Sequence, residues 1–171
     1  MSEHAKKFIA HLQQLKERDR GALATLRHSL AFDPGTYPQA FPYVERFAGA
    51  DAHRRLALYA VAGLFARHPA QASASFATAF GELMRRRDSA SIEQRFIALL
   101  RADAENVFEY LKQAISLLAA DGLGFNYVQL LDDLSRWLNP NPNLHEQRDR
   151  LRRWACDFYR ALQPVSETEK N

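Results

Sequence analysis

Apolar residues recur along almost the whole chain at spacings of three and four residues, and no segment alternates strictly between apolar and polar positions. Spacing of this kind is typical of amphipathic helices, whereas strict alternation would indicate a strand with one buried face. The pattern therefore predicts an all-α protein with eight or nine helices.

Breaks that contain proline separate the expected helices. The clearest are residues 33–38 (DPGTYP) and residues 139–143 (NPNPN), because proline removes an amide donor and clashes with the preceding helical turn. Pro69 ends a longer helix, which Asp51 can cap at its start.

These helices group into two halves. We predict an N-terminal helical bundle over residues 1–88, a C-terminal helical bundle over residues 89–162, and a flexible tail over residues 163–171. The large aromatic residues on the apolar stripes of the second half are expected to lie in the core rather than to stack on bases: Phe96, Trp137, Trp154 and Phe158.

Composition is that of a globular protein in a reducing compartment. The chain has 171 residues, of which 47% are hydrophobic, and its longest uncharged apolar run, residues 56–66, is far shorter than the roughly 20 residues that span a bilayer. Residues 1–19 are charged throughout, unlike a signal peptide. The single cysteine, Cys156, permits no internal disulfide, and we expect it to be a small buried side chain. We therefore predict a cytoplasmic protein with no membrane partner.

Motifs for catalysis are missing from the sequence. Gly122 and Gly124 are too few for a phosphate loop and indicate a helix end followed by a turn. His145 begins a segment that starts like a zinc-binding HExxH motif, but Asp149 stands where the second histidine would be. The neighbours Asp132 and Asp133 point in different directions on a helix. We predict no metal, no cofactor and no enzymatic activity.

Net charge gives a weak indication of a polyanionic partner. The chain has 23 basic and 20 acidic residues, a formal charge of +3. Cations at a helix end, such as Arg85 to Arg87, are stabilised by the helix dipole and need no ligand. Arg153 can pair with Asp149 or Asp157 at four-residue spacing, whereas Arg148 and Arg152 have no such partner and are better candidates for phosphate contact.

Three other arginines are less easily explained by packing. Arg54 and Arg55 lie in the first turn of the helix that follows Asp51, where the dipole disfavours cations and favours bound anions. Arg101 projects opposite an apolar stripe, and Arg95 flanks the same stripe, where its stem could simply cover apolar surface. We assign phosphate contact to all four as a hypothesis.

Several segments resemble the CasB family, the small subunit of the type I-E CRISPR Cascade complex. The resemblance spans about residues 17–162 in the same order and rests on five segments: RGALATLRHSLAF, DPGTYPQAFPYVERF, SIEQRFIALLRAD, LLDDLSRWLNPNPN and RRWACDFYRAL. The family often has another arginine directly after the ALLRAD string, where this chain has Ala104.

The resemblance implies an all-α, non-catalytic subunit of two helical halves, present as two copies in the complex. Its implied partners are the backbone and large subunits of Cascade, the crRNA, the target and non-target DNA strands, and a second copy of itself. The family's nucleic-acid contacts map by position onto the following basic residues: Arg27, Arg54, Arg101 and Lys112, with Arg95 and Arg136 as weaker matches.

The residues and the resemblance favour the same mechanism, in which contacts to the nucleic-acid backbone stabilise an R-loop whose sequence is read by the guide. We hypothesise that Arg54, Arg101 and Lys112 line one groove. A helical protein–protein adaptor without nucleic-acid contact stays open as an alternative, as does a small helical enzyme with an unfamiliar site.

Overall fold

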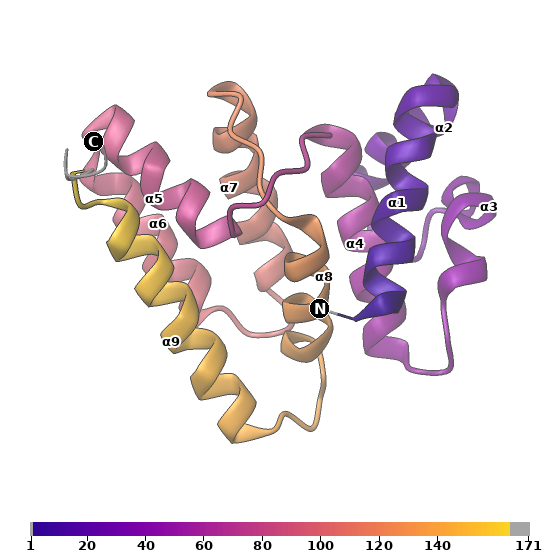
Figure 1. The fold of residues 1–171 in the computed structure, drawn as a ribbon. Helices are drawn as coiled ribbons and strands as arrows, with labels where there is room; N and C mark the ends of the chain where they lie inside the picture. Colours follow the sequence, from indigo (N-terminus) through magenta and orange to yellow (C-terminus); the bar gives the residue numbers. More distant parts are fainter. Residues whose placement is uncertain (1, 165–171) are drawn as a thin grey trace.

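The computed structural model describes residues 2–164, and these residues form nine α-helices and three short 3-10 helices (Figure 1). The sequence prediction of an all-α protein with eight or nine helices is confirmed. Apart from Gln163 and Pro164, the predicted tail over residues 163–171 lies outside the described residues. The α-helices are α1 (Glu3–Arg18), α2 (Arg20–His28), α3 (Phe41–Val44), α4 (Ala52–Arg67), α5 (Phe76–Arg87), α6 (Ala90–Arg101), α7 (Val107–Ala120), α8 (Tyr127–Trp137) and α9 (Leu144–Ala161).

Helix α4 lies in the middle of the N-terminal half and is buried on all sides. Every residue from Ala57 to Ala66 is buried, which explains why this segment is apolar throughout rather than amphipathic. Helices α1, α2, α7 and α8 pack against it. The approach to the end of α2 is close, because a Cβ on Gly63 would lie 2.7 Å from a methyl carbon of Leu30.

A second group of helices is built around α5 and α9, which lie side by side (Figure 1). Phe96 of α6 stacks on Phe158 of α9 with ring centroids 4.0 Å apart, and the two tryptophans also lie in the core. The expected burial of Phe96, Trp137, Trp154 and Phe158 is therefore confirmed.

Packing crosses the boundary that the sequence analysis placed at residue 88. Helix α5 precedes that boundary and packs mainly on α9, while α8 follows it and packs on α4 and α1. The division into bundles over residues 1–88 and 89–162 stays a prediction, and each of these two ranges contributes a helix that packs mainly against the other.

The end of α4 is joined to the start of α8 and to the loop before it by hydrogen bonds. The hydroxyl of Tyr127 donates to the carbonyl oxygen of His68 at 2.5 Å, and the Nε2 of His68 donates to the carbonyl oxygen of Leu123 at 2.6 Å. Gly122 has a φ of +66°, as expected for the predicted helix end and turn. Burial raises the pKa of the Tyr127 hydroxyl well above its ordinary value, which keeps it a hydrogen-bond donor.

Two local expectations are corrected. Cys156 is exposed rather than buried, because it lies two positions from Trp154 and therefore on the other side of α9. Asp51 occupies the N-cap position of α4, but its side chain pairs with Arg54 and makes no capping hydrogen bond.

None of the described helices combines the length and the apolar character that a membrane crossing requires.

Gly81 is the point of closest approach between α5 and α9, and we expect Gly81→Ala to destabilise the fold. The added Cβ would lie 2.4 Å from the carbonyl oxygen of Phe158 and 2.9 Å from the Cβ of Ala161. Alanine in place of glycine stabilises a helix by about 1 kcal/mol. Overpacking typically costs about 1–3 kcal/mol, and the cost here is in the upper part of this range because the crowded atom belongs to the backbone and cannot move aside easily. We expect the free energy of unfolding in urea to fall by about 1–2 kcal/mol.

Gly49→Ala is the matched control, because no atom lies within 4 Å of a Cβ placed there. Its free energy of unfolding should stay within about 0.5 kcal/mol of the wild-type value. Equal stability of the two variants would contradict the tight α5–α9 contact.

Candidate nucleic-acid interface

The nine basic residues selected from the sequence lie on several parts of the surface. Seven are exposed, namely Arg27, Arg54, Arg95, Arg101, Arg136, Arg148 and Arg152, whereas Arg55 and Lys112 are partly buried. Tertiary contacts decide which of these charges are available to a ligand.

A shallow cleft between the end of α2 and the end of α4, the α2–α4 cleft, has a lining with basic and no acidic side chains among the described residues. Its volume is about 440 Å³, and its lining consists of Ala24, Arg27, His28, Leu30, Ala31 and Arg67. Among the described residues, no Asp or Glu lines this cleft. Arg27 forms no ion pair within residues 2–164, and the Nη1 of Arg67 donates to the uncharged Oγ of Ser116 at 3.1 Å. No carboxylate among residues 2–164 therefore neutralises either guanidinium charge.

Lys112 of α7 lies at the edge of the α2–α4 cleft. Its Nζ donates to the carbonyl oxygen of Leu30 at 3.1 Å and pairs with Glu109 at 3.0 Å. The ammonium group thus compensates a free carbonyl where α2 and the following 3-10 turn end. Part of its charge is balanced by Glu109, so Lys112 adds less positive potential than the two arginines.

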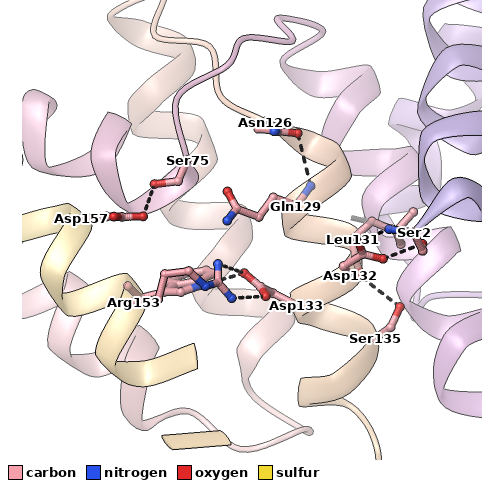
Figure 2. A network of polar contacts seen from close by, with 11 residues as sticks. Ser2, Ser75, Asn126, Gln129, Leu131, Asp132, Asp133, Ser135, Arg153 and Asp157 are labelled. Atoms are coloured by element: carbon pink, nitrogen blue, oxygen red, sulfur yellow. Dashed lines mark hydrogen bonds and ion pairs between the residues drawn. The ribbon is translucent and has the colours of Figure 1, made fainter. Parts of the chain in front are cut away.

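A larger cleft of about 850 Å³ between the start of α4 and α8, the α4–α8 cleft, contains Arg46, Arg54 and Arg136. Three carboxylates line it as well: Asp51, Asp132 and Glu146. Arg54 pairs with Asp51 at 3.4 Å. Asp132 accepts hydrogen bonds from the backbone nitrogen of Ser2 at 2.9 Å and from its hydroxyl at 2.8 Å (Figure 2). The opposite charges balance, so this cleft attracts anions less than the α2–α4 cleft does.

Arg46 is held in the α4–α8 cleft by a histidine. The Nη2 of Arg46 donates to the Nδ1 of His11 at 2.9 Å, and the Nε2 of His11 donates to the carbonyl oxygen of Tyr43 at 2.8 Å. This arrangement requires the neutral form of His11. Burial, together with the nearby Arg46 charge, lowers the pKa of His11 below its usual value.

The guanidinium group of Arg55 is held by contacts within the fold. It pairs with Glu45 at 3.1 Å, reaches the carbonyl oxygen of Gly35 at 3.4 Å, and lies over the rings of Phe41 and Tyr59. The Tyr59 hydroxyl also donates to Glu45. These contacts hold the proline-rich segment over residues 33–47 against α4. The charge of Arg55 is already paired with Glu45, and phosphate contact by Arg55 stays a hypothesis.

The other selected residues are spread over α6, α8 and α9. Arg95 lines a smaller cleft of about 280 Å³ with Tyr110 and Gln113, and Arg101 ends α6 at the surface. Arg148 and Arg152 are exposed on α9. Arg54 lines the α4–α8 cleft, Lys112 lies at the edge of the α2–α4 cleft, and Arg101 lines none of the three clefts described, so a single groove shared by these residues stays a prediction.

Arg153 does not pair with Asp149 or Asp157 as expected. It instead binds Asp133 of α8 through both terminal nitrogens, at 3.0 and 2.5 Å, and Asp133 also accepts a hydrogen bond from the Nε1 of Trp154 at 2.8 Å (Figure 2). The Asp133 residue is only 2% exposed, so a buried carboxylate on α8 is paired with a partly exposed guanidinium group on α9. The carboxylate raises the pKa of the Arg153 guanidinium.

Sequence reasoning missed Arg67 of the α2–α4 cleft and Arg46 of the α4–α8 cleft. Arg67 is the last residue of its helix, where a cation is expected on dipole grounds alone. It lies 40 positions after Arg27 in the chain, so only the packing of α4 on α2 brings the two together. Arg67 therefore carries no signal in the sequence that would distinguish it from an ordinary helix-terminal arginine.

Comparison with known families shows which family the chain belongs to. The model of the family "CRISPR-associated protein Cse2" matches residues 22–159, which is most of the chain. The chain belongs to the Cse2 family. A Cse2 protein of Thermus thermophilus is 38% identical over 96% of this chain and 94% of its own length.

Solved structures agree with this assignment. A crystal structure of CasB from Thermus thermophilus has 37% sequence identity and a TM-score of 0.78 over 93% of this chain and 99% of its own. CasB from M. ruber has 30% identity and a TM-score of 0.75, with 95% of each chain covered. A chain of a CRISPR RNA-guided surveillance complex, 23% identical, has the same fold with a TM-score of 0.78 over 94% of each chain. The resemblance to the CasB family seen in the sequence is confirmed.

Replacing Arg54 and replacing Arg55, the first two arginines of α4, should have very different effects on the free energy of unfolding. Arg55→Ala removes an ion pair and two cation–π contacts, and we expect it to lower the free energy of unfolding by about 1–2 kcal/mol. Arg54→Ala removes only an exposed pair and should change that free energy by less than about 0.5 kcal/mol. Urea denaturation of both variants distinguishes the structural arginine from the available one, and similar losses would contradict this distinction.

Glu45 gives this Cse2 family member an acid-sensitive contact. Hydrogen bonds from Arg55 and Tyr59 hold the pKa of Glu45 below its ordinary value of 4.5. A carboxyl group whose pKa is lower in the folded state stabilises the fold fully above its unfolded pKa, and this stabilisation is lost as pH falls through the folded pKa. The wild-type chain should therefore have a higher Tm than Glu45→Gln at neutral pH. The difference should shrink below about pH 4.5, and a gap independent of pH would contradict the assignment.

Proposed function

We propose that this chain is a non-catalytic subunit of a CRISPR RNA-guided surveillance complex that contacts nucleic acid through its basic residues. Its ligands are the crRNA–target heteroduplex and the displaced DNA strand, and its protein partners are the backbone and large subunits of Cascade and a second copy of itself. The Cse2 family assignment and the shared fold with a chain of such a complex support this role. A role in the type I-E system and a place in the cytoplasm belong to the same proposal.

The α2–α4 cleft is the structural feature that best supports contact with nucleic acid. Arg27 and Arg67 converge on it with Lys112 at its edge, and no carboxylate of the described residues lines it. A guanidinium group is weakly hydrated and can donate two parallel hydrogen bonds to a phosphate. Two such groups without acidic neighbours favour a phosphodiester backbone over a neutral or basic partner.

The remaining basic residues extend this surface. Arg54 and Arg136 reach the α4–α8 cleft at the other end of α4, and residues 54 and 67 are separated by about 20 Å along the helix at 1.5 Å per residue. Contacts at both ends of α4 would span several phosphates of one strand, which follow one another at about 3.4 Å along the axis of duplex DNA. Arg95, Arg101, Arg148 and Arg152 are proposed as additional contacts of the assembled complex.

The small net charge is compatible with this role. Replacing a DNA duplex by an RNA–DNA heteroduplex is nearly balanced in free energy, so a few backbone contacts suffice to favour the open R-loop. Sequence is read by base pairing, and the protein needs no base-specific hydrogen bonds. A net charge of +3, with several arginines paired to carboxylates, suits a subunit that acts within a larger assembly.

Neutralising the α2–α4 cleft is the test of this proposal. The double variant Arg27→Gln/Arg67→Gln should bind a single-stranded oligonucleotide more weakly at low salt than the wild-type chain. Each lost arginine–phosphate contact should reduce the slope of log K against log salt concentration by about 0.7, so the double variant should lose up to about 1.4. Fluorescence anisotropy over a salt series measures both effects.

The control variant is Arg85→Gln/Arg86→Gln, which removes the same charge from two arginines that pair with Glu82 on α5. It should leave affinity and salt slope close to wild type. Equal losses in the two double variants would show that only total charge matters and would overturn the assignment to this cleft.

A protein–protein adaptor is the second candidate function. Leu144 and Leu151 are exposed on α9, with 64% and 36% of their surface accessible, and exposed apolar side chains favour protein contacts. A chain that functions only as an adaptor would show no salt-dependent binding to single- or double-stranded DNA in the same titration.

A further inference from the structure

Three aromatic side chains form a cluster next to the α2–α4 cleft. They are His28, Phe32 and Tyr37, from the end of α2 and the segment that follows it. His28 lines the cleft itself and also contacts both other rings. The aromatic cluster is therefore continuous with the surface that carries Arg27 and Arg67.

Phe32 presents an unusual amount of aromatic surface to solvent. Its ring lies parallel to that of Tyr37, with an interplanar angle of 5° and centroids 4.9 Å apart, while 45% of the residue is exposed. Among the large apolar side chains that the structure describes as exposed, Phe32 is the only phenylalanine. A ring stacked on one side and half exposed offers its other side to a planar ligand.

The backbone around the aromatic cluster is well fixed. The Phe32 nitrogen donates to the carbonyl oxygen of Ser29 at 3.1 Å, and a turn follows in which Thr36 donates to the carbonyl oxygen of Asp33 from both its nitrogen and its hydroxyl. Gly35 supplies the positive φ of +79° that this turn requires. Arg55 binds the Gly35 carbonyl oxygen, so α4 holds the turn that places Tyr37 against Phe32. A platform that is ordered before binding loses less entropy when a ligand arrives.

We propose that Phe32 stacks on an unpaired nucleobase of a single strand whose phosphates contact Arg27 and Arg67. This inference rests on the proposed function and adds to it the part of the nucleic acid that this surface recognises. Aromatic side chains beside a basic groove are the arrangement that binds single strands without sequence preference, because every base has a π-face. Bases within a duplex are already stacked on their neighbours and cannot use such a platform.

Local packing is the competing explanation for the aromatic cluster. Phe32 contacts Tyr37 and His28, and this contact could serve only to close the loop over residues 33–36. In that case its replacement would change stability and would not distinguish a strand with bases from one without. The two explanations therefore differ in a measurable way.

The experiment compares two single-stranded DNA oligomers of equal length, oligo(dT) and a fully abasic strand, each titrated onto the full chain at low salt. Both carry the same phosphates, so the ratio of their affinities reports base stacking alone. We expect the wild-type chain to prefer oligo(dT) by about 5- to 20-fold, the lower part of the range for stacking on one aromatic side chain. Phe32→Ala should abolish this preference and leave the salt slope unchanged.

Phe32→Trp provides a second readout. Trp137 and Trp154 are buried, with 8% and 3% of their surface exposed, so a tryptophan at position 32 would be the one accessible indole among the described residues. Its emission should be quenched by oligo(dT) and not by the abasic strand, and the preference for bases should be retained. Tyr159→Ala is the control, because Tyr159 is 41% exposed on α9, which lies on the opposite side of the molecule from α2 (Figure 1). This variant should keep the wild-type preference.

Each outcome has a definite meaning. Equal, salt-dependent affinity of the wild-type chain for both oligomers would overturn the stacking inference and leave the proposed function standing. A parallel decrease of both affinities in Phe32→Ala would also overturn it, because the ring would then act only through the fold. Binding of neither oligomer by the wild-type chain would overturn the inference together with the proposed function.

Discussion

A helix that is apolar around its whole circumference requires other helices on every side, and α4 imposes this requirement on the rest of the fold. Helices α1, α2, α7 and α8 meet it by packing around residues 57–66. Only the two ends of α4 reach the surface, and both ends carry arginine. The burial of the middle of this helix thus determines where Arg54 and Arg67 emerge and which neighbours they meet.

Ion pairs within the fold compensate part of the charge on this protein. The buried carboxylate of Asp133 is satisfied by Arg153 and Trp154, so a polar contact joins α8 to α9 (Figure 2). Arg150 is also buried, with its guanidinium 4.1 Å from the centre of the Trp137 ring, and its Nε has no hydrogen-bond partner among residues 2–164. Burial accordingly lowers the pKa of Arg150. Arg27 and Arg67 also contact no carboxylate of the described residues, and they differ from the other unpaired arginines because both line the α2–α4 cleft, which no carboxylate of the described residues lines.

Helices could be predicted from the sequence, and contacts between helices could not. Periodicity and proline breaks were enough for the fold class, the number of helices and the burial of the large aromatic residues. Cys156 was misplaced because the stripe on α9 is narrow, and two positions around a helix move a side chain from the core to solvent. Arg153 was assigned a partner on its own helix because spacing within a helix is visible in the sequence, whereas Asp133 lies 20 positions away on α8. Arg27 and Arg67 form one cleft for the same kind of reason, so the candidate site depends on packing that no local pattern encodes.

The bond between Ser2 and Asp132 has a consequence for how the protein is made. These residues are 130 positions apart, and the buried contact of His68 with Leu123 spans another 55. On the ribosome, the start of α1 therefore lacks its contact with α8 until most of the chain has left the exit tunnel, and α4 lacks part of its cover until α8 follows. The first helices that emerge must wait, partly exposed, for the last ones. Apolar surface that stays exposed during such a delay favours aggregation of the nascent chain.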